Sequence, residues 1–236
     1  AATLADAVPA APDVHNPRPA AVSITQASEA GTLYGLEEIA AIAEVAKARG
    51  LALQMDGARF ANAVAALGCS PAEASWKAGV EVLALGATKN GCLAAEALIF
   101  FRPGLAAGMA ERRKRGGHLF SKHRFLAAQL LAYFENELWL KNARHANAQA
   151  RALAAGLAGL PEVEIHHAVE ANLIFARLSK RLADALEAEG FGFYRWGEGG
   201  REVRLVCAFD TKPEDVAALT AAARRLTGQD ERRARA

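Results

Sequence analysis

Two short apolar runs, each followed by a charged residue, constrain the fold more than any other feature of this sequence. Residues 51–55 and 80–85 have the length and aliphatic composition of buried strands. About thirty residues with helical character separate their ends, which is the size of one strand–helix–strand unit. A further helix is predicted over residues 36–49, with Gly50 as its terminating residue. The pattern therefore predicts an α/β fold in which the two runs are parallel strands of one sheet.

The charged residues after these runs are Asp56 and Lys89. The carboxyl ends of parallel strands are where α/β sheets bind ligands, and loss of water there would lower the pKa of a lysine. A neutral amine is what Schiff-base chemistry requires. Taken alone, the lysine is more simply interpreted as a solvent-exposed residue at a strand end. The two charges together could form a structural ion pair. They also suit pyridoxal phosphate, which offers an aldehyde to the amine and a basic ring nitrogen to the carboxylate.

Composition excludes several classes of function. The 236 residues carry a net charge of +2, from 28 basic and 26 acidic residues, which argues against a nucleic-acid or membrane partner. No segment is long and apolar enough to span a bilayer, and the N-terminus has no signal-peptide pattern. Cys69, Cys92 and Cys207 have no metal-ligand spacing, so we expect no metal, no disulfide framework and a reducing compartment. The predicted location is cytoplasmic.

The predicted elements along the chain indicate two domains. Four prolines predict a loop over residues 9–19, and helices are predicted over residues 61–67, 71–78, 105–114, 118–133 and 138–157. The last third alternates short strand-like runs with helical stretches and closes with a helix that begins at Pro213. We therefore predict part of a large cofactor-binding domain over residues 1–117. Connecting helices and a small C-terminal α+β domain are expected over residues 118–236.

Three stretches together resemble the low-specificity L-threonine aldolases: residues 55–60 (MDGARF), 86–91 (GATKNG) and 113–118 (RKRGGH). The resemblance implies the aspartate-aminotransferase-like fold, that is, fold type I of the pyridoxal-phosphate enzymes. Such a large domain has a mostly parallel sheet with helices on both faces. The implied activity is a lyase that cleaves the Cα–Cβ bond of L-threonine or L-allo-threonine, a β-hydroxy-α-amino acid, to glycine and acetaldehyde. The implied assembly is a homo-oligomer, a dimer of dimers.

The resemblance also implies roles for four residues. Lys89 would be the catalytic lysine that binds pyridoxal 5'-phosphate covalently, and Asp56 would pair with the pyridine nitrogen. Arg59 would lie beside the cofactor and the substrate carboxylate, and Arg204 would bind the same carboxylate. A guanidinium group fixes a planar carboxylate through two parallel hydrogen bonds, which would decide which Cα bond is cleaved. From the residues alone, Arg204 is equally a solvated strand arginine.

Two departures from the family pattern limit these expectations. Gln26 falls near a histidine of one family pattern and cannot act as a base. Family members also carry a long segment before the point that matches Ala1, which supplies a phosphate-binding helix N-terminus and a ring-stacking histidine. We therefore expect weak cofactor binding and impaired activity in the chain given. The alternatives are another enzyme of the same cofactor fold, an aminotransferase or β-eliminating lyase, and a non-catalytic remnant.

Overall fold

The computed structural model describes residues 1–8, 15 and 17–234, with side chains as far as Gly228. Most of the loop predicted over residues 9–19 lies outside these residues. Contacts divide the chain into two compact units, Ala1–Ser28 with Tyr34–Leu140, and Glu29–Leu33 with Lys141–Ala236. The sequence predicts a domain boundary after residue 117, and that boundary stays a prediction. The compact units divide after Leu140.

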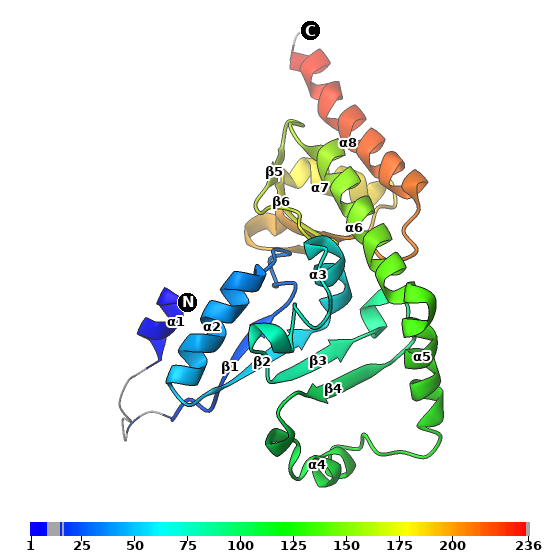
Figure 1. The fold of residues 1–236 in the computed structure, drawn as a ribbon. Helices are drawn as coiled ribbons and strands as arrows, with labels where there is room; N and C mark the ends of the chain where they lie inside the picture. The colour runs from blue at the N-terminus through cyan, green and yellow to red at the C-terminus, as the bar shows by residue number, and fades with distance from the viewer. Residues whose placement is uncertain (9–14, 16, 235–236) are drawn as a thin grey trace. The chain divides into compact units, whose positions relative to one another are not determined.

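The first unit is built on a four-stranded sheet in the order β1-β2-β3-β4 (Figure 1). The first three strands are parallel, and β4 runs antiparallel to β3. The two apolar runs thus form neighbouring parallel strands, as predicted. The strands are β1 (Ala21–Thr25), β2 (Ala52–Gly57), β3 (Val82–Gly86) and β4 (Glu96–Phe100).

Helices α2 (Leu36–Ala48) and α3 (Phe60–Leu67) lie on one face of this sheet. Alternate strand residues such as Leu53, Met55 and Leu83 are buried on the face covered by α2 and α3. These two helices make successive parallel crossovers in one direction along the sheet, which places both on the same face. On the opposite face, α4 (Met109–Arg115) and α5 (Arg124–Phe134) border a cavity of about 870 Å³. The apolar residues that line this cavity include Ala84, Leu98, Phe100, Met109, Phe120 and Leu126.

Three predicted helices differ from the structure. Residues 71–75 form turns, and only η1 (Trp76–Ala78), a short 3-10 helix, follows them. Residues 103–106 form η3 (Pro103–Ala106), also a 3-10 helix, before α4 begins. The helix predicted from residue 118 begins at Arg124, because Lys122 has a φ of 68°, which no right-handed helix accommodates.

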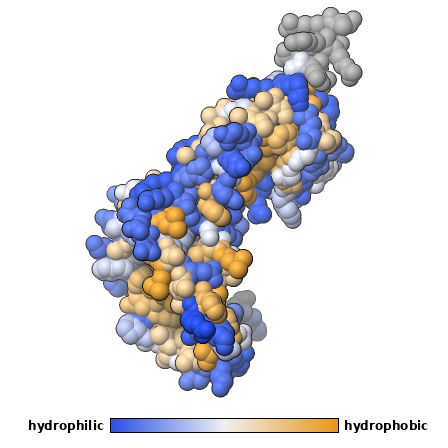
Figure 2. Space-filling model, turned by 90° about the vertical axis from the view of Figure 1, so that its right-hand side faces the viewer, coloured by the Kyte–Doolittle hydropathy of each residue, from blue (hydrophilic) through white to orange (hydrophobic). Residues whose placement is uncertain are grey.

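On the side of the molecule shown in Figure 2, hydrophobic patches lie over the region of α5, whose Phe125, Leu131 and Phe134 are exposed.

The second unit has a four-stranded antiparallel sheet in the order β5-β6-β8-β7. One face of this sheet packs against three helices, and Ile174, Leu182 and Val203 at the centre of that core are fully buried. Ser179 caps the middle helix by accepting a hydrogen bond from the Leu182 amide at 3.0 Å. The elements are α6 (Leu138–Leu157, which begins in the first unit), β5 (Val163–Ile165), β6 (Leu173–Leu178), α7 (Lys180–Ala188), β7 (Tyr194–Trp196), β8 (Glu202–Val206) and α8 (Pro213–Ala234).

The described residues contain neither a membrane-spanning helix nor a cluster of potential metal ligands. Within residues 1–8, 15 and 17–234, none of the helices combines the length and apolarity needed to cross a membrane. The same residues contain no group of three or more His, Cys, Asp or Glu side chains arranged to hold a metal ion.

Candidate active site

Asp56 lies near the carboxyl end of β2, on the face of the sheet opposite the buried Met55. It pairs in register with Thr25 on one side and Ala84 on the other. Its Oδ1 accepts a hydrogen bond from the Ala58 amide at 2.9 Å, which turns the chain sharply after the strand. The half-buried carboxylate is therefore held by a central strand with a parallel neighbour on each side.

Lys89 lies three residues beyond the end of β3, in the 3-10 turn η2 (Thr88–Asn90). Because β2 and β3 are parallel, their carboxyl ends lie at the same edge of the sheet, and Asp56 and Lys89 both lie at that edge. The turn leads the chain out beyond the strand ends, so the Lys89 side chain is exposed and the expected loss of water is not found. Within the described residues Asp56 and Lys89 make no ion pair, so the interpretation as a structural ion pair is wrong.

Two glycines bring these strand ends into close contact. A Cβ atom added at Gly57 would lie 2.9 Å from the Ala84 carbonyl oxygen. One added at Gly86 would lie 2.7 Å from the Cα atom of Ala58. Both distances are shorter than van der Waals contact, so only glycine permits the approach. The turn after Asp56 is consequently packed directly against the start of the turn that carries Lys89.

Arg59 is the N-cap residue of α3, three positions after Asp56, and is half-buried. The N-terminus of a helix carries a partial positive charge and favours acidic residues, so a cation there does not stabilise the helix. The first turn of α3 contains no acidic residue that would compensate. Arg59 therefore places a guanidinium group near the sheet edge where Asp56 and Lys89 lie.

Gln26 has a structural role that the sequence did not indicate. It is fully buried, donates from Nε2 to the Tyr34 carbonyl at 2.9 Å and accepts at Oε1 from the Tyr34 amide at 3.1 Å. Its own backbone amide donates to the Asp56 carbonyl at 2.8 Å. Gln26 thus closes the loop after β1 beside Asp56, and its amide is already engaged in hydrogen bonds.

The sequence also did not predict a buried hydrogen-bond network beside Lys89. Asn90 is 3% exposed, and its Nδ2 donates to Tyr133 Oη at 2.7 Å and to the Trp139 carbonyl at 2.8 Å. Burial raises the pKa of Tyr133 to about 12, so its hydroxyl stays neutral under ordinary conditions. The asparagine next to the lysine was the one visible sign of this network, since its partners lie more than forty positions along the chain.

Arg204 lies in the second unit, in the middle of β8, between the cross-strand neighbours Phe175 and Tyr194. Its Nε is buried and has no hydrogen-bond partner among the described residues, and its guanidinium group lies 5.4 Å from the centre of the Tyr194 ring. Other arginines of this sheet are paired: Arg177 binds Glu202, and Arg195 binds two carboxylates of α7. Arg204 has no carboxylate partner among the described residues, which suits an arginine that binds an external anion.

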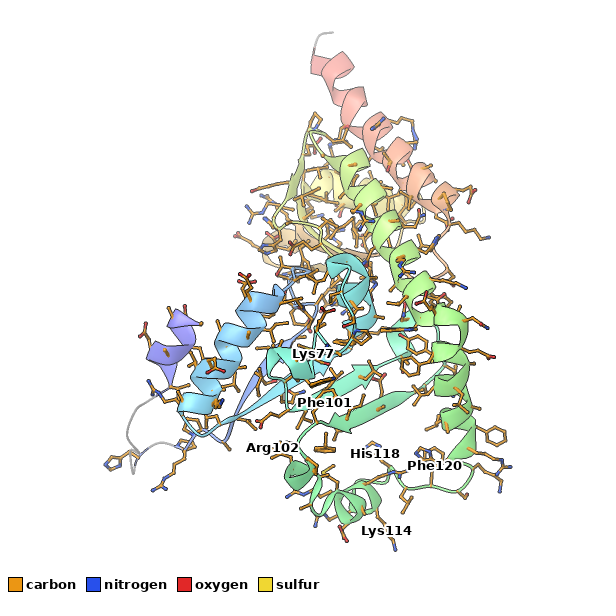
Figure 3. All side chains as sticks on the ribbon, viewed as in Figure 1. Lys77, Phe101, Arg102, Lys114, His118 and Phe120 are labelled. Carbon is orange, nitrogen blue, oxygen red and sulfur yellow. The ribbon has the colours of Figure 1, made fainter. Side chains whose placement is uncertain are left out.

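A second cavity of the first unit, of about 580 Å³, lies at the opposite edge of the sheet. Figure 3 labels Phe101 and Arg102 where β4 ends, beside the start of β3, and Lys77 in η1. In this cavity Arg102 is paired with Glu81. Parallel sheets bind ligands at their carboxyl edge, so the edge with Asp56 and Lys89 remains the better candidate.

Comparison with known proteins agrees with this assignment of the fold. The chain is 48% identical over 217 residues to the low specificity L-threonine aldolase of Pseudomonas aeruginosa, covering 92% of the chain and 62% of that protein. It is 45% identical over 210 residues to the same enzyme of Pseudomonas sp., covering 89% and 60%. The chain therefore spans about three fifths of the length of these relatives, and the resemblance noted in the sequence is confirmed.

A solved structure and a protein family also match. The structure of a Leishmania major threonine aldolase superposes with a TM-score of 0.88 at 26% identity, covering 96% of this chain and 66% of that one. This match confirms the predicted fold class, an α/β large-domain portion followed by a smaller α+β unit. The protein family described as beta-eliminating lyase matches residues 1–181. The chain therefore belongs to the beta-eliminating lyase family.

Proposed function

We propose that this chain is the catalytic part of a pyridoxal-phosphate-dependent lyase that cleaves L-threonine or L-allo-threonine to glycine and acetaldehyde. The observation that carries the proposal is the position of Asp56 near the end of β2 and of Lys89 beyond the end of the adjacent parallel strand β3, at one edge of the sheet. The 45–48% identity to proteins named low specificity L-threonine aldolase supports the reaction and the substrate class.

The residues present fit the cofactor by their chemistry. When bound, pyridoxal phosphate supplies an aldehyde for an amine and a ring that accepts electrons from a cleaved Cα bond. The exposed Lys89 amine is free to form the covalent bond. The Asp56 carboxylate would accept a hydrogen bond from the protonated ring nitrogen and hold the proton there. Its position on the face away from the α2–α3 core keeps it open to such a ligand.

The two arginines would orient the substrate. Arg59 lies at the edge that carries Lys89, and the buried Nε of Arg204 has no hydrogen-bond partner among the described residues. A carboxylate bound through two parallel hydrogen bonds has one orientation, so the bond from Cα to Cβ is the one presented for cleavage. In the reaction threonine loses its β-hydroxyl proton, acetaldehyde departs, and a proton is added at Cα to give glycine. Gln26 takes no part in the proton transfer, since its amide neither ionises nor is free.

The test is product analysis with purified chain, added pyridoxal phosphate and L-threonine. In line with the weak cofactor binding and impaired activity expected from the sequence, the expected result is slow formation of glycine and acetaldehyde in equal amounts, and loss of both with Lys89→Ala. Lys77→Ala is the matched control, because Lys77 is also exposed and lies at the opposite edge of the sheet. Cleavage that survives in Lys89→Ala would refute the assignment.

A β-eliminating lyase is the second candidate, favoured by the description of the matching family. It would release a keto acid and ammonia instead of glycine and an aldehyde, so the same product analysis separates the two. A homo-oligomer arranged as a dimer of dimers and a cytoplasmic location complete the proposal. Size-exclusion chromatography with light scattering and fractionation of the source cells would test them.

A further inference from the structure

We propose that Asn90 and Tyr133 are positioning residues that hold Lys89 in the place where its amine reacts with the cofactor aldehyde. The inference rests on the proposed function and extends it to residues that do not touch the cofactor. Both N–H bonds of the Asn90 amide are used, one to Tyr133 Oη and one to the Trp139 carbonyl. Because a carbonyl only accepts hydrogen bonds, the amide nitrogen must face it, and the side chain has one orientation.

The residue on the other side of Lys89 is held as well. Thr88 Oγ1 accepts a hydrogen bond from the Ala95 amide at 3.1 Å, and the Ala87 amide donates to the Ala95 carbonyl at 3.1 Å. The Ala94 amide donates to Gln129 Oε1 on α5 at 3.1 Å. The exposed Lys89 side chain thus projects from a segment, residues 87–95, that is hydrogen-bonded to itself and to α5.

This arrangement does more than fill space. A buried amide costs free energy unless it is hydrogen-bonded, and an apolar residue would fill the same volume without that requirement. What the amide adds is a single allowed conformation for the residue next to Lys89. The neutral Tyr133 hydroxyl keeps its hydrogen-bonding role over the pH range in which a lysine amine loses its proton. The network therefore stays intact under the conditions in which Lys89 reacts.

The test measures the reactivity of Lys89 with pyridoxal 5'-phosphate itself. Condensation of the amine with the aldehyde releases one water, and borohydride then supplies the hydride that converts the C=N bond into a stable secondary amine. Peptide mass spectrometry gives the ratio of label on Lys89 to label on Lys77, an exposed lysine that serves as internal reference. We expect a ratio well above one in the wild-type chain.

The variants are Asn90→Ala, which removes both hydrogen bonds, and Tyr133→Phe, which removes one and keeps the ring. A displacement of about 1 Å can lower reactivity by up to about a hundredfold, so we expect at least a tenfold lower ratio with Asn90→Ala. Tyr133→Phe should give an intermediate loss and serves as the test if Asn90→Ala does not fold. The matched control is Asn172→Ala, since Asn172 is also 3% exposed and also donates to a backbone carbonyl, that of Cys207, at 2.8 Å.

An unchanged ratio with Asn90→Ala, or an equal loss with Asn172→Ala, would overturn the proposal. Hydrogen exchange of the amides of residues 87–95 provides a second readout, which should speed up in Asn90→Ala and not in Asn172→Ala. If wild-type Lys89 shows no preference over Lys77, the proposed function loses its covalent lysine. In that case, unchanged hydrogen exchange in Asn90→Ala would show that the positioning proposal had failed too. Faster exchange in Asn90→Ala would show that Asn90 still anchors the turn, although Lys89 is not the covalent lysine.

Discussion

The ends of β2 and β3 should not tolerate even one added methyl group, and Gly86→Ala tests this. The new Cβ would lie 2.7 Å from the Cα atom and 3.0 Å from the carbonyl oxygen of Ala58. Carbon atoms pack best at about 3.5–4.0 Å, so the backbones would have to separate by about 0.8 Å. Because both contacts are with main-chain atoms, no side-chain rotation relieves them. Overpacking of this kind costs about 1–3 kcal/mol.

Thermal unfolding followed by circular dichroism measures this cost. For a chain of this size, each kcal/mol lowers Tm by about 2–4 °C. Gly104→Ala is the control, because among the described residues no atom outside its neighbours in the chain lies within 4 Å of the Cβ position there, and its φ is not in the left-handed region. We expect its effect to stay within about 0.5 kcal/mol. Labelling of Lys89 by pyridoxal phosphate should also fall in Gly86→Ala, since the turns after both strands are displaced. Equal Tm values for the two variants would refute the argument from close packing.

Three further predictions concern the second unit. Leu182→Ala should lower the free energy of unfolding by about 2–5 kcal/mol in urea titrations, because its side chain is fully buried in the core. Hydrogen bonds from Arg177 and then His166 hold the pKa of Glu202 below its ordinary value of 4.5. This stabilisation is therefore present above pH 4.5 and is lost as the pH falls through the folded-state pKa. The Tm difference between wild type and Glu202→Gln should shrink from pH 7 to pH 3, and a constant difference would contradict it. Arg204→Lys should raise KM for threonine about tenfold with a smaller change in kcat, measured by acetaldehyde release; an unchanged KM would remove Arg204 from substrate binding.

Sequence reasoning succeeded where the signal was local. An apolar run followed by a charge located both Asp56 and Lys89 at strand ends, and the spacing between the runs predicted their parallel pairing. It failed where contacts between distant segments determine the exposure of a side chain or the bounds of a helix. The exposure of Lys89 depends on the path of a turn, and the start of α5 depends on a single positive φ at Lys122. The contact of Asn90 with α5 had no periodic pattern from which it could be predicted.

The two central groups of the candidate site are supported by different parts of the fold. Asp56 belongs to a strand with a parallel neighbour on each side, whereas Lys89 lies in a turn that α5 helps to anchor. Local opening needs less free energy than global unfolding, and a surface turn opens before a central strand does. Mild denaturant should therefore abolish preferential labelling of Lys89 before the sheet unfolds. Loss of labelling and loss of circular dichroism at the same urea concentration would mean instead that turn and sheet form one cooperative unit, and that Lys89 is placed as firmly as Asp56.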